Sequence, residues 1–215
     1  WVELVRDVVR QYNPEADFVF WTYNWGGAKE DLRLDFIRAL PKDVALMATF
    51  EMYESHKKRN GLHARIDDYS LCVAGPGRYF ASEAMEAKRQ GLRLFTMSNT
   101  GGLTWDFGTV PSLPMPQQWK KRWDALKAAN ADWGLCGLME NHHYGWYPSF
   151  VSELAKEAFT EGGMDFGQHI RKIAARDFGA ENAETAVQAW EMWSRAIEDY
   201  LATAANQYGP FRIGP

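Results

Sequence analysis

The stretch VALMATFE at residues 44–51 decides the fold, because a nearly unbroken apolar run ends in a carboxylate, Glu51. A run of this length without polar alternation is typical of a strand buried on both faces of a parallel sheet. Similar runs recur at residues 17–23, 69–74, 92–98 and 132–139. Because helical patterns separate these runs, the sequence predicts an α/β fold with a parallel sheet of about five strands.

Apolar residues at helical spacing predict helices over 2–12, 32–40, 79–90, 117–129 and from Pro148 onward. The charged residues 52–66 predict a long loop, and the Gly- and Pro-rich residues 100–115 predict an ordered loop. The C-terminal part differs, because residues 165–178 and 182–206 predict two helices with no strand between them. We therefore divide the chain into a strand-and-helix part, 1–160, and a helical extension, 161–215.

Composition excludes several classes of protein. The 215 residues carry a net charge of -4, which provides no broad basic surface for nucleic acid. No apolar stretch approaches the roughly 20 residues of a membrane span. The two cysteines, Cys72 and Cys136, are too few for a disulfide scaffold and are expected to be buried free thiols. The chain begins at Trp1 without an initiator Met, so we expect a processed product or an excised piece of a longer protein.

Each apolar run ends in a polar residue. Asn24, Glu51, Asn99 and Glu140, the last followed by Asn141, come directly after predicted strands. Ligands of parallel α/β proteins bind at the carboxyl ends of the strands, so these residues are candidates for a site. Glu51 and Glu140 are the candidate catalytic carboxylates. The alternative is that such groups only cap the backbone of the loops.

Aromatic residues crowd the same strand ends. The chain holds 10 Trp, 9 Tyr and 12 Phe, many of them beside the polar residues. Sugars present apolar C–H faces and hydroxyl edges, so aromatic rings beside carboxylates and amides indicate a carbohydrate site. The alternative is that the aromatic rings only pack the loops against the rest of the protein. The candidate sugar-binding residues are Trp21, Tyr23, Asn24, Trp25, Asn99, Trp105, Asp106, Asn141, His142, His143 and Trp146.

A metal site is the weaker interpretation of the segment around Glu140. Glu140, His142 and His143, together with His56 or His63, would supply metal-ligating groups. The sequence has no His-x-His or His-Glu-x-x-His spacing, and adjacent histidines normally point apart. We therefore predict no metal and no other cofactor.

Two segments resemble a known family. The stretches NTGGLTWD at 99–106 and MENHHYGWYPS at 139–149 are similar to the last barrel segments of bacterial proteins related to glycoside hydrolase family 20, the β-N-acetylhexosaminidases. The resemblance implies the C-terminal part of a (β/α)8 barrel whose first part is missing, followed by a helical extension. It covers about residues 1–208 and is loose outside the two segments.

The resemblance also implies roles for residues. The family uses an adjacent Asp-Glu pair at a strand end, which this chain lacks, and Glu140 stands where a family Glu holds sugar hydroxyls. The Trp that precedes that Glu in the family is displaced here to Trp133, which departs from the family pattern. Tyr23, Trp105 and Trp146 would line the sugar subsite.

The sequence thus predicts part of a glycoside hydrolase, acting on glycosides such as N-acetylhexosaminides, with this segment mainly supplying sugar-binding residues. A non-catalytic carbohydrate-binding domain and a metal-dependent hydrolase using His142 and His143 are the alternatives. A part-built barrel also leaves strand edges unpaired, and the apolar segments 17–23 and 132–139 lack the Pro and Lys that guard edges. We therefore expect a homodimer or higher oligomer; the alternative is that the predicted helices over 165–206 fold over the gap.

Overall fold

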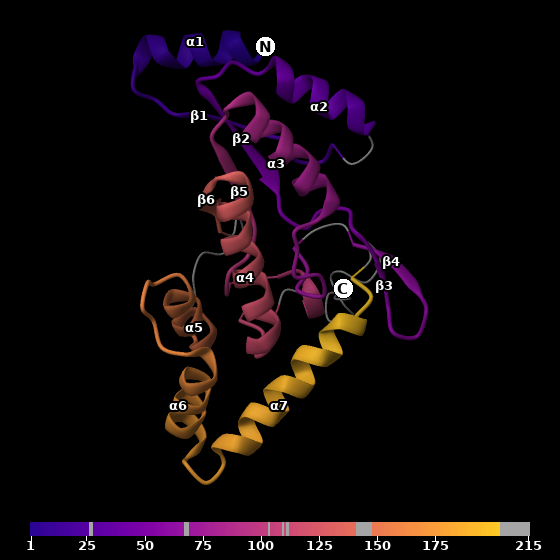
Figure 1. The fold of residues 1–215 in the computed structure, drawn as a ribbon, viewed down its shortest axis with the longest axis vertical. Coiled ribbons are helices and arrows are strands. Elements are labelled where there is room, and N and C mark those ends of the chain that lie inside the picture. Colours follow the sequence, from indigo (N-terminus) through magenta and orange to yellow (C-terminus); the bar gives the residue numbers. More distant parts are fainter. Residues whose placement is uncertain are drawn as a thin grey trace, which may run out of the picture.

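A computed structural model describes residues 1–25, 28–66, 69–102, 104–108, 110, 112–140 and 148–202. Within these residues, the strands β1 (Phe18–Trp21), β2 (Val44–Thr49), β5 (Leu94–Met97) and β6 (Leu135–Met139) form one sheet in the order β1-β2-β5-β6. All three neighbouring pairs are parallel (Figure 1). The helices are α1 (Val2–Tyr12), α2 (Glu30–Ala39), α3 (Arg78–Gln90), α4 (Pro116–Trp133), α5 (Phe150–Ala158), α6 (Phe166–Phe178) and α7 (Ala183–Ala196).

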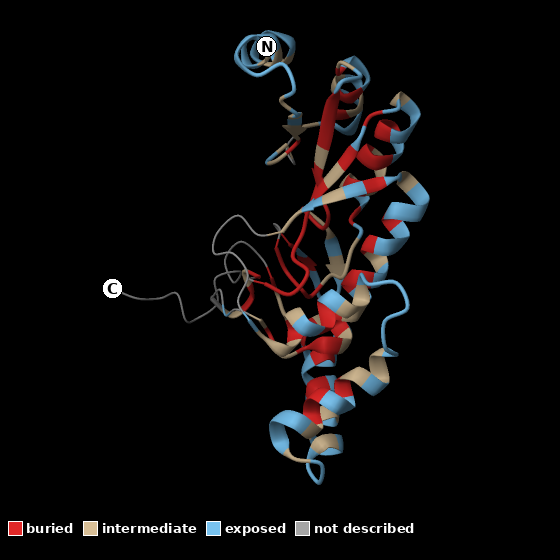
Figure 2. Cartoon of the chain, turned by 90° about the vertical axis from the view of Figure 1, so that its left-hand side faces the viewer, coloured by how far each residue is buried: buried red, intermediate tan, exposed pale blue. Residues whose placement is uncertain are grey.

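One face of the sheet is covered by helices. Leu46 and Ala48 of β2 point to this face and are fully buried against Ile37 of α2 and Phe80 of α3. Leu126 of α4 extends the same core toward β6. Figure 2 shows these helices on one side of the buried strands. The helical layer therefore buries this face of the apolar strands.

A second core joins the C-terminal helices to the rest of the chain. Trp119 and Trp123 of α4 are fully buried together with Leu154 of α5, Ile173 of α6 and Trp190 of α7. The ring of Trp190 stacks on Phe150 at a centroid distance of 4.6 Å. The helices of the extension thus pack mainly on α4, on α5 and on each other.

The α/β prediction is confirmed, and the number of strands is corrected. The described residues place four strands in the parallel sheet, not about five. β1 and β6 are its edges, as expected for the apolar segments 17–23 and 132–139. No helix in the described part of the chain is both long enough and apolar enough to cross a membrane.

The predicted strand at residues 69–74 is wrong. Its backbone is bonded by side chains instead of by a neighbouring strand: Arg122 donates to the carbonyls of Ser70, Val73 and Ala74, and Gln118 donates to that of Leu71. Because buried backbone groups must be paired, side chains of α4 replace the ladder that a strand would need. An apolar run alone does not reveal this kind of partner.

Three further expectations are corrected. Residues 52–66 are not a plain loop, since β3 (Ser55–Lys57) and β4 (His63–Arg65) form an antiparallel pair within them. The helix expected over 182–206 ends at Ala196 and is followed by a short 3-10 turn, Ile197–Asp199. Cys136 is an exposed free thiol, because it lies on the edge strand β6, whereas Cys72 is buried as expected.

Candidate functional site

The candidate site lies at the carboxyl edge of the sheet, where the parallel strands end together. Asn24 follows β1, Glu51 follows β2, Asn99 follows β5 and Glu140 follows β6 directly. Parallel pairing across the whole sheet places these four positions along one edge. Their side chains, however, have very different surroundings.

Glu51 is buried in an ion pair. Its Oε1 lies 3.2 Å from Nη1 of Arg122, and neither side chain has any exposed surface. Ser98 Oγ donates to Oε2 of Glu51 at 3.4 Å. Burial raises the pKa of Glu51 to about 7, and Arg122 opposes that rise without cancelling it. Glu51 therefore exchanges its proton near neutral pH while having no contact with solvent.

Arg122 is the centre of the polar network beneath the site. Besides Glu51, its guanidinium donates to the carbonyls of Ser70 at 2.7 Å, Val73 at 2.7 Å and Ala74 at 2.8 Å. It also reaches Ser98 Oγ at 3.1 Å. The planar guanidinium offers five donors in a fixed geometry, which is why one side chain can hold a loop and two strand ends together.

Asp106 is a second fully buried carboxylate. It accepts hydrogen bonds from Ser70 Oγ and from the backbone N–H of Leu71, both at 2.7 Å. Burial raises the pKa of Asp106, while these donors act in the opposite direction. The carboxylate of Asp106 thus binds the same loop of residues 69–74 that Arg122 holds.

Glu140 is half-buried and bound to the loop after β5. Thr100 donates to it twice, from its backbone N–H at 2.7 Å and from Oγ1 at 2.5 Å. Burial is the main cause that raises the pKa of Glu140. The carbonyl of Thr100 in turn accepts from Trp123 Nε1 at 2.6 Å. The end of β6 is therefore tied through Thr100 to the core helix α4.

Four aromatic rings, which we call the aromatic row, run along the same edge. Trp21 stacks on Tyr23 at a centroid distance of 4.5 Å. Tyr23 lies 6.3 Å from Tyr69, and Tyr69 lies 4.7 Å from Trp105. Tyr69 is buried, and the other three rings are partly exposed. The row joins the end of β1 to two loops and offers aromatic surface to a ligand.

Trp25 does not belong to this row. Its ring packs edge-on against Phe20 at 5.7 Å and Phe36 at 5.0 Å, between β1 and α2. The structure thus separates the predicted aromatic residues into two groups. Trp21, Tyr23 and Trp105 lie together, whereas Trp25 fills a gap on the helical face.

The two candidate amides also differ. Asn24 is exposed, and its Oδ1 accepts from the hydroxyl of Tyr53 at 3.2 Å. Asn99 is 1% exposed, and its Nδ2 has no hydrogen-bond partner among the described residues. An unpaired buried donor costs about 1–3 kcal/mol, so a group that accepts from Asn99 would be stabilised at this edge.

The loops at this edge adopt unusual backbone conformations. Asn24, Tyr53, Tyr69 and Phe107 have φ values of 61°, 57°, 53° and 52°. Positive φ costs a bulky residue of the order of 1–3 kcal/mol, and such residues cluster at functional sites. Tyr69 belongs to the aromatic row, and Tyr53 donates to Asn24. Ser112, in the loop before α4, has a φ of 52° as well, so the strained positions are spread over several loops.

Several predicted residues lie outside the described part of the chain, namely Asn141, His142, His143 and Trp146. Within the described residues, no group of three or more His, Cys, Asp or Glu side chains is arranged to hold a metal ion. His56 on β3 and His63 on β4 lie on neighbouring strands of the small sheet.

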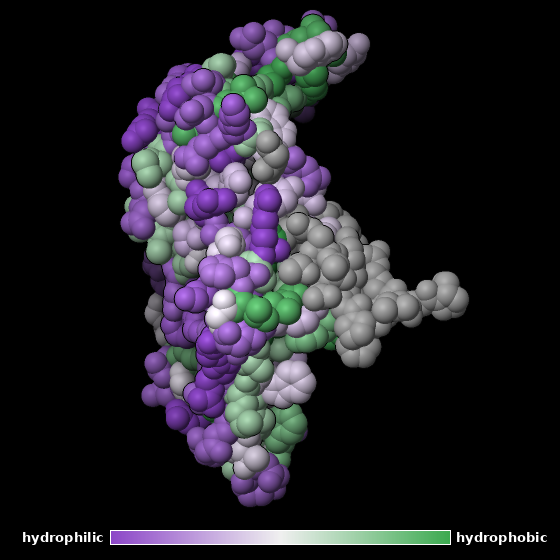
Figure 3. Space-filling model, turned by 90° about the vertical axis from the view of Figure 1, so that its right-hand side faces the viewer, coloured by the Kyte–Doolittle hydropathy of each residue, from purple (hydrophilic) through white to green (hydrophobic). Residues whose placement is uncertain are grey.

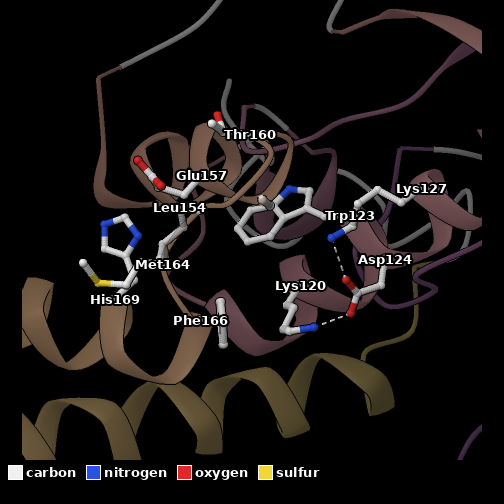
Figure 4. A pocket seen from close by; sticks show the side chains of 12 residues that line it. Lys120, Trp123, Asp124, Lys127, Leu154, Glu157, Thr160, Met164, Phe166 and His169 are labelled. Atoms are coloured by element: carbon white, nitrogen blue, oxygen red, sulfur yellow. Dashed lines mark hydrogen bonds and ion pairs between the residues drawn. The ribbon is translucent and has the colours of Figure 1, made fainter.

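A separate cavity of about 250 Å3 lies on the helical side of the molecule, between α4, α5 and α6 (Figure 4). Charged groups on one side of the cavity are paired with each other, because Asp124 forms ion pairs with both Lys120 and Lys127. His169 and Glu157 line the opposite side. The cavity takes no residue from the strand ends, so it is distinct from the candidate site.

Sequence reasoning did not find Arg122, Thr100 or Tyr69. Arg122 had a detectable signal, since it stands on the apolar stripe of Trp119, Trp123 and Leu126 at helical spacing. A charged residue on a core-facing stripe indicates a buried partner of opposite charge. Thr100 and Tyr69 carry no comparable signal, because their roles depend on how the loops fold.

Comparison with known proteins identifies no relative: no family model, curated protein or solved structure matches this chain.

Proposed function

We propose that the chain supplies the sugar-binding wall of a site that binds and hydrolyses glycosides, such as those of N-acetylhexosamines. The observation that carries this proposal is the aromatic row at the carboxyl edge of the sheet. Trp21, Tyr23 and Trp105 provide flat apolar surface for sugar rings. The unpaired amide of Asn99 offers a donor for a hydroxyl or an acetamido carbonyl.

The surroundings of the carboxylates support a binding role more than a catalytic one. Glu51 and Asp106 are fully buried and held by Arg122 and by the loop of residues 69–74. Glu140 is half-buried and held by Thr100. A general acid must reach the leaving-group oxygen, so Glu140 is the one of these three that is placed to do so.

Calorimetric titration with an N-acetylglucosamine oligosaccharide tests the binding. We expect Trp105→Ala to weaken binding at least tenfold, because the loss of one stacked ring removes both contact area and C–H–π attraction. Trp193→Ala is the matched control, since Trp193 is 54% exposed on α7, away from the aromatic row. Absence of binding by the unmodified chain, or equal weakening by both variants, would refute the proposal.

A non-catalytic carbohydrate-binding domain is the second candidate, because Glu51, Asp106 and Glu140 are all bound by other groups of the protein. Hydrolysis of a nitrophenyl N-acetylglucosaminide separates the two. Sugar binding without turnover supports the binding domain, whereas turnover that Glu140→Gln abolishes supports a hydrolase with its acid in this chain. No observation on the described residues supports the metal-dependent hydrolase.

A further inference from the structure

The cavity of about 250 Å3 between α4, α5 and α6, which we call the helical cavity, has two charged walls. The charged side chains of one wall come from α4, and those of the opposite wall come from α5 and α6 (Figure 4). Figure 3 shows mostly hydrophilic side chains along the outer side of the helical layer. A hollow that combines apolar side chains with convergent charged groups differs from that surface and is a candidate for a second binding site.

The wall on α4 carries an excess of positive charge. Asp124 forms ion pairs with both Lys120 and Lys127, and its Oδ1 lies 3.2 Å from Nζ of Lys127. One carboxylate that is shared by two ammonium groups leaves one positive charge in excess. The three side chains are 42–49% exposed, and ion pairs in such surroundings are weak. The two lysines can therefore turn to the carboxylate of a ligand with little loss.

The opposite wall offers acceptors that have no partner. The carboxylate of Glu157 forms no hydrogen bond or ion pair with the described residues, and the buried Nδ1 of His169 has no hydrogen-bond partner among them. A carboxylate only accepts hydrogen bonds, and a neutral imidazole can present Nδ1 as an acceptor. A buried polar atom without a partner costs free energy, so an ammonium group placed at this wall would be stabilised.

Apolar side chains separate the two walls. Trp123 and Leu154 are buried, and the ring of Phe166 meets that of Trp123 edge-on at a centroid distance of 6.5 Å. Met164 is 44% exposed beside them. Figure 4 shows Trp123 between the lysines on one side and His169 on the other. A ligand that reaches from one wall to the other must therefore cross an apolar section.

We propose that the helical cavity binds a small linear zwitterion, with its carboxylate at the α4 wall and its ammonium group at Glu157 and His169. An apolar chain lies between these two ends, so an ω-amino acid is the simplest ligand of this class. The cavity is somewhat smaller than the roughly 300–1,000 Å3 of pockets for drug-sized molecules, which suits a ligand of this size. It takes no residue from the aromatic row, so this site does not depend on sugar binding.

Calorimetric titration with ε-aminocaproate tests the binding, and three related compounds test how the ligand is recognised. Caproate lacks the ammonium group, and hexylamine lacks the carboxylate. Norleucine has the same atoms as ε-aminocaproate but carries both charged groups on one carbon. We expect ε-aminocaproate to bind at least tenfold more tightly than each of the other three, because only this compound presents opposite charges at its two ends.

Two variants assign the charged ends of the ligand to the walls. Glu157→Gln should weaken ε-aminocaproate at least tenfold and leave it no tighter than caproate, because the ammonium group loses its ionic partner. Lys127→Gln should weaken it similarly and leave it no tighter than hexylamine, because Lys120 and Asp124 then form a neutral pair. Glu161→Gln and Lys172→Gln are the matched controls. They remove the same charges from exposed positions that do not line the cavity, and they should change binding less than twofold.

The imidazole resonances locate the ligand independently of the variants. Addition of ε-aminocaproate should shift those of His169 and leave those of His63 unchanged, since His63 is exposed on β4 and does not line the cavity. The inference is overturned by any of three results: no binding heat at millimolar ε-aminocaproate, equal affinity for the four compounds, or equal losses in the cavity variants and their controls. Binding that leaves the His169 resonances unmoved would also overturn it, because the ligand would then lie elsewhere.

Discussion

Arg122 on α4 and Glu51 after β2 are 71 residues apart in the sequence, yet Nη1 and Oε1 lie 3.2 Å apart with both side chains completely buried. A buried pair of this kind contributes little net stability, but removal of one partner leaves an uncompensated charge. Arg122 also holds three backbone carbonyls. The pair therefore fixes the position of the loop that carries Tyr69 into the aromatic row.

Arg122→Met should lower the free energy of unfolding by about 3–5 kcal/mol, because it leaves the buried Glu51 carboxylate and the carbonyls of the loop without their hydrogen-bond donor. Arg122→Lys should restore only part of this loss, since an ammonium cannot reproduce the planar donor geometry. Urea unfolding measures both. Lys120→Met on the same helix is the control and should change stability by less than about 0.5 kcal/mol. Equal losses for the two Met variants would contradict the role of Arg122.

Glu51→Gln should change how stability depends on pH. The pKa of Glu51 is raised from 4.5 to about 7 by burial, so the folded state binds a proton that the unfolded state has released. Its contribution is present below pH 4.5 and is lost as pH rises toward 7, by about 3 kcal/mol in total. The difference between the unmodified and Glu51→Gln unfolding curves should therefore vary between pH 4.5 and 7.5. A difference that is constant over this window would contradict a raised pKa.

Gly137→Ala should destabilise the sheet by about 1–3 kcal/mol through overpacking. A Cβ at this position would lie 2.3 Å from the ring of Phe95 on the neighbouring strand. Phe95→Leu in the same chain should recover part of the loss, so the two substitutions should be non-additive in a thermal-unfolding cycle. Stabilisation by Gly137→Ala alone, as expected from reduced freedom of the unfolded chain, would show that the ring moves aside freely.

Thr100→Val should cost about 1–3 kcal/mol, because the Glu140 carboxylate loses the hydroxyl donor at 2.5 Å. It should also raise the pKa of Glu140 further, since the donors from Thr100 favour the ionised form. Carbon-detected NMR titration of the Glu140 carboxyl reports that pKa directly. Thr160→Val, which removes a hydroxyl bonded to the Lys156 carbonyl on the surface, is the control.

The regular part of the fold follows from local patterns. The runs at 44–50 and 92–98 became β2 and β5 because unbroken apolar sequence leaves little choice but burial on both faces. The run at 69–74 is equally apolar, yet it is held by Arg122 and Gln118 instead of by a strand. The structure of this segment depends on side chains about 50 residues away, which a local sequence pattern does not include.

The candidate site, too, was only partly predictable from the sequence. Parallel strands put Asn24, Glu51, Asn99 and Glu140 at one edge, as their sequence positions predict. Their individual surroundings were not predictable, because burial of Glu51 depends on a cation from α4 and that of Asp106 on the loop it binds. The positions of polar residues along the chain therefore locate the edge but do not say which of them face a ligand.

The turn between the antiparallel strands β3 and β4 is bonded to the 3-10 turn Ile197–Asp199 that follows α7. Lys58 Nζ donates to the carbonyl of Glu198 at 2.9 Å, and the Arg59 N–H donates to Asp199 at 3.2 Å, across 140 residues of chain. Contacts so distant in sequence form late, because closing a long loop costs entropy before any contact repays it. On a ribosome, residues 55–65 emerge before residues 198 and 199, so this pair of strands cannot dock until that later segment has been made. The order of synthesis therefore delays this docking, and the hairpin stays without these contacts while the intervening chain is being made.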